Sequence, residues 1–233
     1  MVRLDKILSH MGYGSRKDVK KMIRQGRVEI NGNIVFDDDT KVNELEDEIS
    51  IDDSIIDTYS EKIYIMLNKP QNVVSATFDY NDETVIDLVS EYASYKIFPV
   101  GRLDKDTEGL LVLTNDGKLA HSLLSPKNHV EKEYYVELND TINLKMVEIF
   151  KKGIVLDDGY VCQSSVLIPI NDKSANVIIY EGKYHQIKRM FNSVGRNVVF
   201  LKRKRMGLLN LDETLKSGEY RLLTPEEIDK IKL

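Results

Sequence analysis

The sequence has few of the groups that form disulfides, hold metal ions or span membranes. Its 233 residues include one cysteine, Cys162, so no internal disulfide can form. The four histidines are not grouped with it at metal-ligand spacing. No apolar run approaches the roughly 18 residues of a membrane span. These absences predict a cytoplasmic protein without a membrane segment, a disulfide or a structural metal.

A net positive charge is also missing. The formal charge of −5 argues at first against a nucleic-acid partner, because phosphate binding needs a local excess of lysine and arginine. The charge is unevenly distributed, however: residues 1–35 and 183–205 are strongly basic, whereas residues 36–61 are acidic and have Lys41 as their only cation. This distribution keeps RNA as a partner and suggests two domains joined by an acidic connector.

The basic N-terminal segment has the pattern of two helices and a hairpin. Apolar residues recur at helical spacing before Met11, and Ser15 can cap a second helix over residues 16–25 that Gly26 ends. Val19, Met22 and Ile23 then share the core face. The basic residues of this helix spread over its opposite side; they are Arg16, Lys17, Lys20, Lys21 and Arg24. Asn-Gly at residues 31–32 favours a type I′ turn between strands 27–30 and 33–36.

In this order, Arg-Leu-Asp-Lys-Ile-Leu at residues 3–8, Ser-Arg at 15–16 and Gly-Arg-Val-Glu-Ile-Asn-Gly at 26–32 resemble the S4 RNA-binding domain. The resemblance implies that residues 1–58 comprise an S4 domain and an acidic linker, and that this part binds structured RNA. The candidate RNA-binding residues are Arg3, Arg16, Lys17, Lys20, Lys21 and Arg24. An S4 domain implies no particular chemistry.

A charged loop precedes a predicted buried strand in the middle of the chain. Residues 101–109 read Gly-Arg-Leu-Asp-Lys-Asp-Thr-Glu-Gly, and the apolar run at 110–114 is followed by Asn-Asp-Gly, which predicts a turn. A rigid strand can hold a carboxylate such as Asp104 at the mouth of a cleft. From the pattern alone, Asp104 and Asp106 fit equally a solvated loop or the carboxylate pair of an N-glycosidase, which would release free uracil.

The run from residue 101 to residue 117 resembles the central motif of the RsuA-type pseudouridine synthases. In that family the aspartate of Gly-Arg-Leu-Asp is the nucleophile, which corresponds here to Asp104. Lys-Glu-Tyr at residues 132–134 resembles the motif whose tyrosine lies over the target base, which implies this role for Tyr134. Because Tyr135 follows directly and would face the other side of a strand, only one of the two can reach the cleft.

Residues 181–191 resemble the third motif of the family, in which the residue at Lys188 pairs with the catalytic carboxylate. Arg102 is predicted to fill the space left by the extruded nucleotide or to bind a flanking phosphate. Lys69, in the Asn-Lys-Pro segment that resembles the first motif, and Arg189 are further candidates for substrate binding. We interpret His185, like the other three histidines, as scaffolding. No residue is assigned to a metal.

The resemblance implies a reaction without redox change and without a cofactor. The N1–C1′ bond of a uridine breaks, the uracil turns, and its C5 joins C1′. Asp104 attacks either C1′ or C6 of the ring, and the sequence leaves both routes open. Lys188 favours the ionised carboxylate. Tyr134 can stack on the uracil and remove the C5 proton. Because the target is inaccessible in a stacked helix, the nucleotide must be flipped out.

The rest of the chain predicts an α+β catalytic domain over residues 59–233. Strands are expected at residues 64–67, 110–114, 134–138, 165–168, 176–180 and 198–202, and helices at 84–92, 144–151 and 186–193. The resemblance implies that these strands form a mainly antiparallel mixed sheet with flanking helices.

The substrate is expected to be small-subunit ribosomal RNA. Residues 125–132 resemble the small-subunit branch of the family, and residues 212–233 are short and mixed in charge, unlike the basic tail of many large-subunit relatives. Because a flipped uridine must be reachable, we expect an assembly intermediate as the partner and one uridine as the target. The enzyme is expected to be a monomer. Large-subunit RNA, or a non-catalytic S4 protein that binds ribosomal RNA, are the alternatives.

Overall fold

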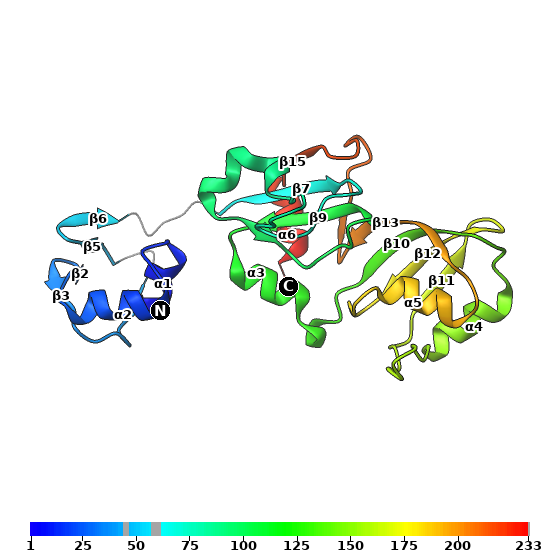
Figure 1. The fold of residues 1–233 in the computed structure, drawn as a ribbon, viewed down its shortest axis with the longest axis horizontal. Helices are drawn as coiled ribbons and strands as arrows, with labels where there is room; N and C mark the ends of the chain where they lie inside the picture. The colour runs from blue at the N-terminus through cyan, green and yellow to red at the C-terminus, as the bar shows by residue number, and fades with distance from the viewer. Residues whose placement is uncertain (44–46, 57–61, 233) are drawn as a thin grey trace. The chain divides into compact units, whose positions relative to one another are not determined.

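The computed structural model describes residues 1–43, 47–56 and 62–232 of the chain. The chain divides into two compact units, Met1–Glu61 and Lys62–Leu233 (Figure 1). Each is described here by itself. No helix among the described residues is long and apolar enough to cross a membrane.

The first unit is built on two helices, α1 (Leu4–His10) and α2 (Arg16–Arg24). Helix α2 begins as its sequence predicts, because the Ser15 hydroxyl accepts the backbone N–H of Asp18 and the Asp18 side chain accepts that of Ser15. Val19 and Ile23 of α2 are fully buried, as expected. Strands β2 (Val28–Ile30) and β3 (Asn33–Ile34) pair antiparallel across the predicted Asn-Gly turn.

The acidic segment is largely part of this first unit and not a connector. Strand β5 (Ile49–Ile51) pairs with β2, and β6 (Ser54–Ile56) pairs with β5, giving a sheet in the order β3-β2-β5-β6. A separate pair joins β1 (Val2–Arg3) and β4 (Lys41–Val42). The expectation of a connector over residues 36–61 was therefore wrong for most of its length, because Ile49 and Ile51 of β5 and Ile56 of β6 enter the core of the unit. Residues 44–46 and 57–61 lie outside the described residues.

The second unit contains one nine-stranded mixed sheet. Its main order is β11 (Val166–Pro169), β12 (Ser174–Ile179), β10 (Lys132–Leu138), β13 (Val198–Met206), β9 (Glu108–Thr114), β7 (Tyr64–Lys69) and β15 (Tyr220–Leu222). β8 (Phe98–Pro99) pairs with β9, and β14 (Leu209–Asn210) with β13. Within the described chain, β9 and β13 form the only parallel pair. The expected mainly antiparallel α+β fold is confirmed.

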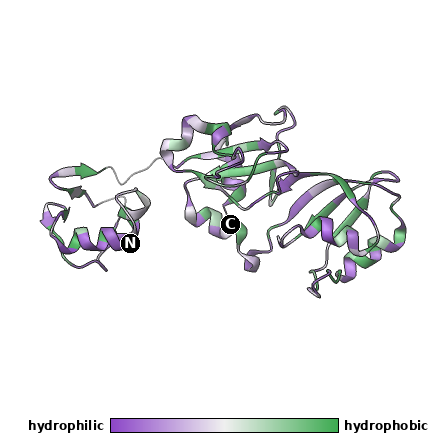
Figure 2. Ribbon diagram, viewed as in Figure 1, coloured by the Kyte–Doolittle hydropathy of each residue, from purple (hydrophilic) through white to green (hydrophobic). Residues whose placement is uncertain are grey.

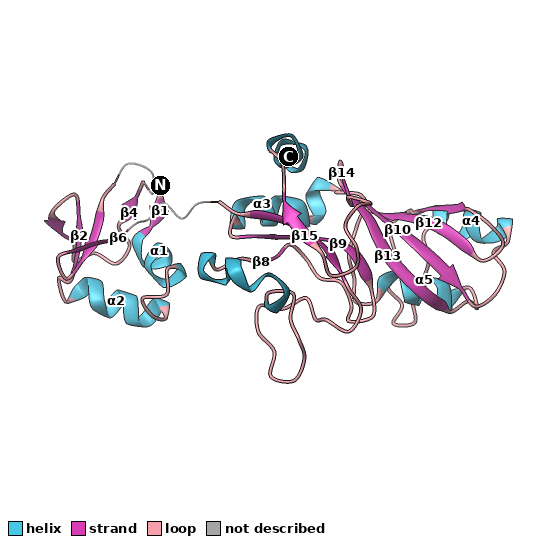
Figure 3. Ribbon diagram, turned by 90° about the horizontal axis from the view of Figure 1, so that it is seen from above, coloured by secondary structure: helices cyan, strands magenta, loops and turns pink. Residues whose placement is uncertain are grey.

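The two halves of this sheet are covered differently. β7 and β9 are apolar at successive positions because both of their faces are buried, one of them against α3 (Gly117–Leu124) and α6 (Pro225–Ile231). Along β10, buried and more exposed residues alternate, and its buried face packs against α4 (Leu144–Lys152) and α5 (Gln186–Ser193). Figure 2 shows the hydrophobic residues concentrated in the central strands, and Figure 3 shows α4 and α5 beside β10, β12 and β13.

Three local expectations differ from the structure. The predicted turn after β9 is the start of α3, because the Asp116 carboxylate accepts the backbone N–H groups of Lys118 and Leu119 and caps the helix. The expected helix at residues 84–92 is a 3₁₀ segment, η1 (Asp87–Tyr95), that Val89 interrupts. A second short 3₁₀ turn, η2 (Pro126–Asn128), follows α3. Strand β7 continues through Lys69 before Pro70 ends the pairing.

Candidate active site and RNA-binding surface

A small cavity of about 80 Å³ lies where the loop before β9 meets the sheet and the start of α5. The loop contributes Arg102, Asp104 and Thr107, and the sheet contributes Tyr134. The third wall is formed by residues of the segment 182–188, which leads into α5 and makes its first turn. The cavity therefore brings together residues more than 80 positions apart in the sequence, among them Asp104 and Lys188.

Lys188 joins the two carboxylates, Asp104 and Asp106, of the loop at residues 101–107, the candidate catalytic loop. Its Nζ donates to Asp104 Oδ2 at 3.0 Å and to Asp106 Oδ1 at 2.5 Å. Burial acts to lower the pKa of Lys188, but hydrogen bonds to the two carboxylates outweigh it and raise the pKa. Burial likewise acts to raise the pKa of Asp106, and the bond from Lys188 reverses this. Lys188 is therefore positively charged and Asp106 ionised at neutral pH.

The two carboxylates differ in where they lie. Asp104 lines the cavity, and its side chain is 28% exposed, whereas Asp106 is not among the described lining residues and its side chain is 69% exposed. A group that must contact a bound nucleotide while excluding bulk water fits the first position better. The geometry thus favours Asp104 over Asp106 as the reacting carboxylate.

The structure also separates the two adjacent tyrosines. Tyr134 lines the cavity and is 8% exposed. Tyr135 faces the opposite side of β10, where its hydroxyl donates to Glu137 Oε1 at 2.8 Å and its ring packs edge-on against Phe200. Since side chains alternate along a strand, only Tyr134 can reach a base held beside Asp104.

Lys69 was expected to bind substrate, but the structure buries it completely beneath the catalytic loop. Its Nζ donates to the carbonyls of Pro70 at 2.9 Å, Thr107 at 3.0 Å and Asp104 at 3.1 Å, with a longer contact of 3.4 Å to Lys105. Burial lowers the pKa of Lys69 to about 8. Lys69 therefore supports the loop that carries Asp104 and does not line the cavity.

The two arginines predicted to bind substrate are placed differently. Arg102 is exposed and lines the cavity. Arg189 is not among the described lining residues; its guanidinium pairs with Asp157 and lies 2.7 Å from Asp158. Successive helical residues point about 100° apart, so α5 can direct Lys188 into the cavity only by turning Arg189 away from it. The expectation for Arg189 finds no support in this geometry.

His185 is a cavity residue that the sequence analysis treated as scaffolding. Its Nε2 lies 3.6 Å from Asp104 Oδ1, and the residue is the N-cap of α5. Its position three residues before Lys188 was the available signal, because such spacing places two side chains on one side of a helix start.

A buried polar network fixes the segment before α5. The Glu181 carboxylate accepts the hydroxyl of Tyr160 at 2.6 Å and the side-chain amide of Gln186 at 2.8 Å. Gln186 Oε1 in turn accepts the backbone N–H of Lys183 at 2.9 Å. Because the Glu181 and Gln186 side chains at the centre of the network are buried, it holds the third wall of the cavity in place.

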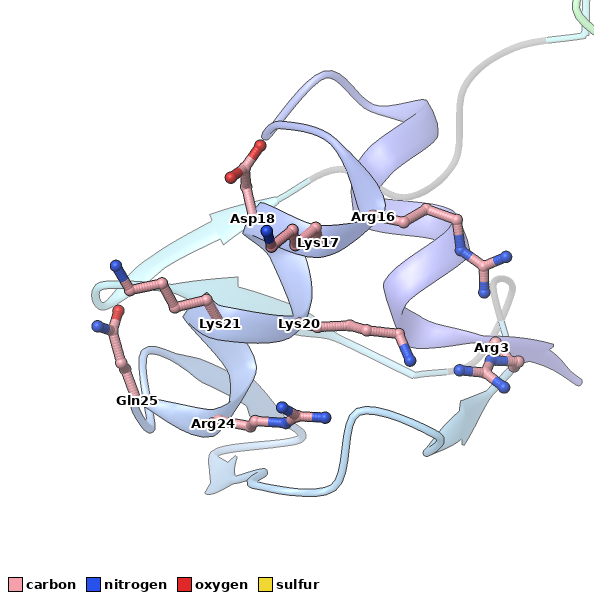
Figure 4. Close-up of a pocket in the computed structure, with 8 residues that line it drawn as sticks. All are labelled: Arg3, Arg16, Lys17, Asp18, Lys20, Lys21, Arg24 and Gln25. Atoms are coloured by element: carbon pink, nitrogen blue, oxygen red, sulfur yellow. The ribbon is translucent and has the colours of Figure 1, made fainter.

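In the first unit, the predicted basic residues of α2 and Arg3 line an open depression of about 800 Å³ (Figure 4). Figure 4 shows Arg16, Lys20 and Arg24 extending toward Arg3, while Lys17 and Lys21 point away from it. These are the two rows that four-residue spacing makes on a helix. The predicted basic stripe is therefore divided into two rows with different surroundings.

The row of Arg16, Lys20 and Arg24 is already paired with carboxylates. Asp5 accepts Arg3 at 3.0 Å and Arg16 at 2.7 Å, and Arg24 lies 2.7 Å from Asp38. Burial acts to raise the pKa of Asp5, but the bonds from Arg3 and Arg16 outweigh it and lower the pKa.

Lys17 and Lys21 form no ion pair with any described residue. These two ammonium groups are the more available ones for RNA phosphates, since binding them breaks no existing pair.

Comparisons with known proteins agree with this arrangement. The family model for RNA pseudouridylate synthase matches residues 63–193, and the S4 domain model matches residues 2–49. The chain is 47% identical over 233 residues to an uncharacterized RNA pseudouridine synthase of Bacillus subtilis, covering 97% of each sequence. It is 39% identical over 231 residues to ribosomal small subunit pseudouridine synthase A of Haemophilus influenzae, covering 99% of each.

A solved structure is similar over the same length. A crystal structure described as that of a pseudouridylate synthase superposes with a TM-score of 0.73 at 39% identity, over 99% of this chain and 100% of the other. The similarity thus includes both units, their order and the segments that form the cavity.

Proposed function

This chain belongs to the RNA pseudouridine synthase family, and we propose that it converts one uridine of small-subunit ribosomal RNA to pseudouridine with Asp104 as the nucleophile. The observation that carries the proposal is the placement of Asp104 in a cavity with Tyr134, its carboxylate held by Lys188 at 3.0 Å.

Each of these groups has a role in the isomerisation. Lys188 holds the carboxylate of Asp104, which adds to C1′ or to C6 of the flipped nucleotide. Tyr134 stacks on the uracil while it turns. After C5 has joined C1′ and the bond to Asp104 has broken, the phenolic oxygen of Tyr134 accepts the C5 proton as its own hydroxyl proton passes to solvent, and N1 of the uracil gains a proton. Arg102, exposed at the rim, contacts the flanking backbone or the space that the nucleotide leaves.

The choice of substrate rests on the relatives. Proteins named ribosomal small subunit pseudouridine synthase A cover nearly the whole chain at 38–39% identity. Because the uridine must be flipped from accessible RNA, we propose a small-subunit assembly intermediate as the partner. We also propose a cytoplasmic monomer that needs no cofactor, since the isomerisation changes no oxidation state.

Asp104→Asn, with Asp106→Asn as the matched control, tests the nucleophile. Both variants remove one carboxylate charge that Lys188 contacts, but only the first removes a cavity residue. We expect Asp104→Asn to lower turnover by about 10³-fold or more, and Asp106→Asn by far less. The assay is tritium release from RNA that contains 5-tritiated uridine. Turnover of Asp104→Asn within about tenfold of wild type would refute the assignment.

A second experiment identifies the RNA substrate and distinguishes isomerisation from hydrolysis. Purified enzyme is incubated with small-subunit RNA, assembly intermediates, mature subunits and large-subunit RNA, and the pseudouridines are mapped. We expect one site, formed best in the assembly intermediate. Modification confined to large-subunit RNA would overturn the substrate, and release of free uracil would show hydrolysis instead of isomerisation.

A further inference from the structure

The imidazole of His185 occupies a constrained position in the wall of the cavity. The residue has φ of +48°, in the left-handed region that most side chains avoid, and it stands directly before the first residue of α5. Its ring stacks on that of Tyr184, with centroids 3.8 Å apart and planes 18° from parallel. Tyr184 is itself 76% exposed. The backbone turn and the stack together fix the plane of the imidazole and leave its Nε2 edge free.

That free edge faces the reacting carboxylate. Lys188 binds Oδ2 of Asp104, and His185 Nε2 lies 3.6 Å from Oδ1. Other polar groups around this carboxylate are Asp106 and Lys69 beneath the loop, and the cavity wall adds Arg102, Thr107, Tyr134, Lys183 and Gln186. Hydrogen bonds in catalytic sites are often long before substrate binds and shorten in the complex. The two oxygens of Asp104 thus face two different partners.

The charges around the carboxylate leave a role for this second partner. Lys188 is shared between Asp104 and Asp106, so one ammonium serves two carboxylates. Lys188, whose pKa is raised, and Asp106, whose pKa is lowered, both keep their charge around neutral pH. The pKa of Lys69, about 8, places its change of charge above neutrality. The ammonium of Lys188 contacts Oδ2 of the Asp104 carboxylate, and the imidazole of His185 lies at Oδ1.

We propose that His185 is a positioning residue for Asp104. It holds Oδ1 so that the plane of the carboxylate is fixed by Lys188 on one oxygen and by the imidazole on the other. Because a displacement of about 1 Å in a reacting group can cost about a hundredfold in rate, loss of this second partner lowers the rate even while Lys188 keeps its bond to Oδ2. This inference rests on Asp104 being the nucleophile.

The test compares kcat and KM of His185→Ala and His185→Gln in the full-length enzyme, by tritium release. The alanine variant removes the partner of Oδ1 and is expected to lower kcat by about tenfold to a hundredfold, with KM for RNA within about twofold. The glutamine side chain keeps an N–H donor of similar reach and is expected to restore most of kcat.

His129→Gln is the matched control. His129 also has a left-handed φ, +47°, and it is exposed at the end of η2, outside the described lining of the cavity. Its variant is expected to keep the wild-type kcat and KM.

A wild-type kcat in His185→Ala would overturn the inference. It would also fall if glutamine failed to rescue kcat, or if alanine raised KM alone, which would indicate an RNA contact. Asp104→Asn distinguishes the two proposals, because loss of activity there with wild-type kcat in His185→Ala refutes this inference only. If His185→Ala does not fold, His185→Asn, whose amide is shorter than that of glutamine, takes its place and is expected to lower kcat as alanine does.

Discussion

Replacing Lys69 by methionine tests whether the ammonium beneath the catalytic loop serves catalysis or mainly stability. Methionine is similar in length, has no charge and fits a buried site. The Lys69 side chain is fully buried, and its Nζ donates to the carbonyls of Asp104 and Thr107 in the loop. The variant therefore removes the support of the loop while filling most of the same space.

The expected change in the free energy of unfolding is small, because two effects oppose each other. Burial lowers the pKa of Lys69 from 10.5 to about 8, so removing the buried charge relieves about 3 kcal/mol. The carbonyls of Pro70 and Thr107 lose the ammonium, at about 1–3 kcal/mol each. The other two carbonyls still accept backbone N–H groups, from Thr107 and Asn72. The net loss should lie within about 3 kcal/mol.

Activity should change much more than stability. A shift of about 1 Å in a reacting group can cost about a hundredfold in rate, so we expect kcat to fall by about that factor. Lys132→Met is the matched control: its pKa is also lowered by burial to about 8, but its Nζ donates to Val130 O and not to the catalytic loop. Denaturant unfolding and tritium release are measured on both variants. A Lys69→Met enzyme with near-wild-type kcat would refute the reasoning.

The same lysine predicts opposite responses of stability and activity to pH. Its folded pKa of about 8 is below the ordinary value of 10.5, so between these values the unfolded chain binds more protons than the folded chain. The contribution of Lys69 to the free energy of unfolding therefore rises with pH across this window. The loop loses the ammonium over the same range, and kcat should decline above about pH 8. The decline should be absent from Lys69→Met.

Three further variants test other parts of the structure. Tyr134→Phe should lower kcat by about a hundredfold or more, because it removes the phenolic oxygen in the cavity. Tyr135→Phe should retain wild-type turnover. Equal effects of the two substitutions would contradict the assignment of Tyr134 as the catalytic tyrosine. Changing Lys17 and Lys21 together to glutamine should make the plot of log binding constant for RNA against log salt concentration shallower by about 1.5 in slope. An unchanged slope would show that these two lysines do not contact phosphate. Gly109→Ala should destabilise the second unit by about 3 kcal/mol or more in denaturant unfolding. The reason is that Gly109 has φ of +103° and that an added Cβ would overlap the backbone oxygen of Arg203 in β13. A variant as stable as wild type would contradict the close approach of the parallel strands β9 and β13.

The amino-acid sequence by itself determined the features that depend on neighbouring residues. Helix α2 begins at the predicted Ser15 cap, and the Asn-Gly turn joins the predicted pair of strands. The apolar run in β9 and the alternation in β10 predicted strands that the structure contains. These features are local, because a cap, a turn or a periodicity is complete within a few residues.

The same local reasoning failed where a residue's environment is made by distant segments. The acidic residues favoured a connector, but Ile49, Ile51 and Ile56 of β5 and β6 become buried when the sheet of the first unit forms. The Asn-Asp-Gly segment was predicted as a turn because the sequence alone does not show which carboxylate accepts which backbone N–H. In the structure, Asp116 caps α3.

The motifs already predicted Asp104, Tyr134 and Lys188, but only the tertiary structure decided how the rest of the candidate site is arranged. It buried Lys69 under the loop, turned Arg189 toward Asp157, and brought His185 to Oδ1 of Asp104. Motif spacing predicts which residues belong to one segment, but these contacts join β7, β9, β10 and α5 through space. Their geometry depends on how the sheet and helices pack, and the side of an element that a residue faces is settled only when that packing is complete.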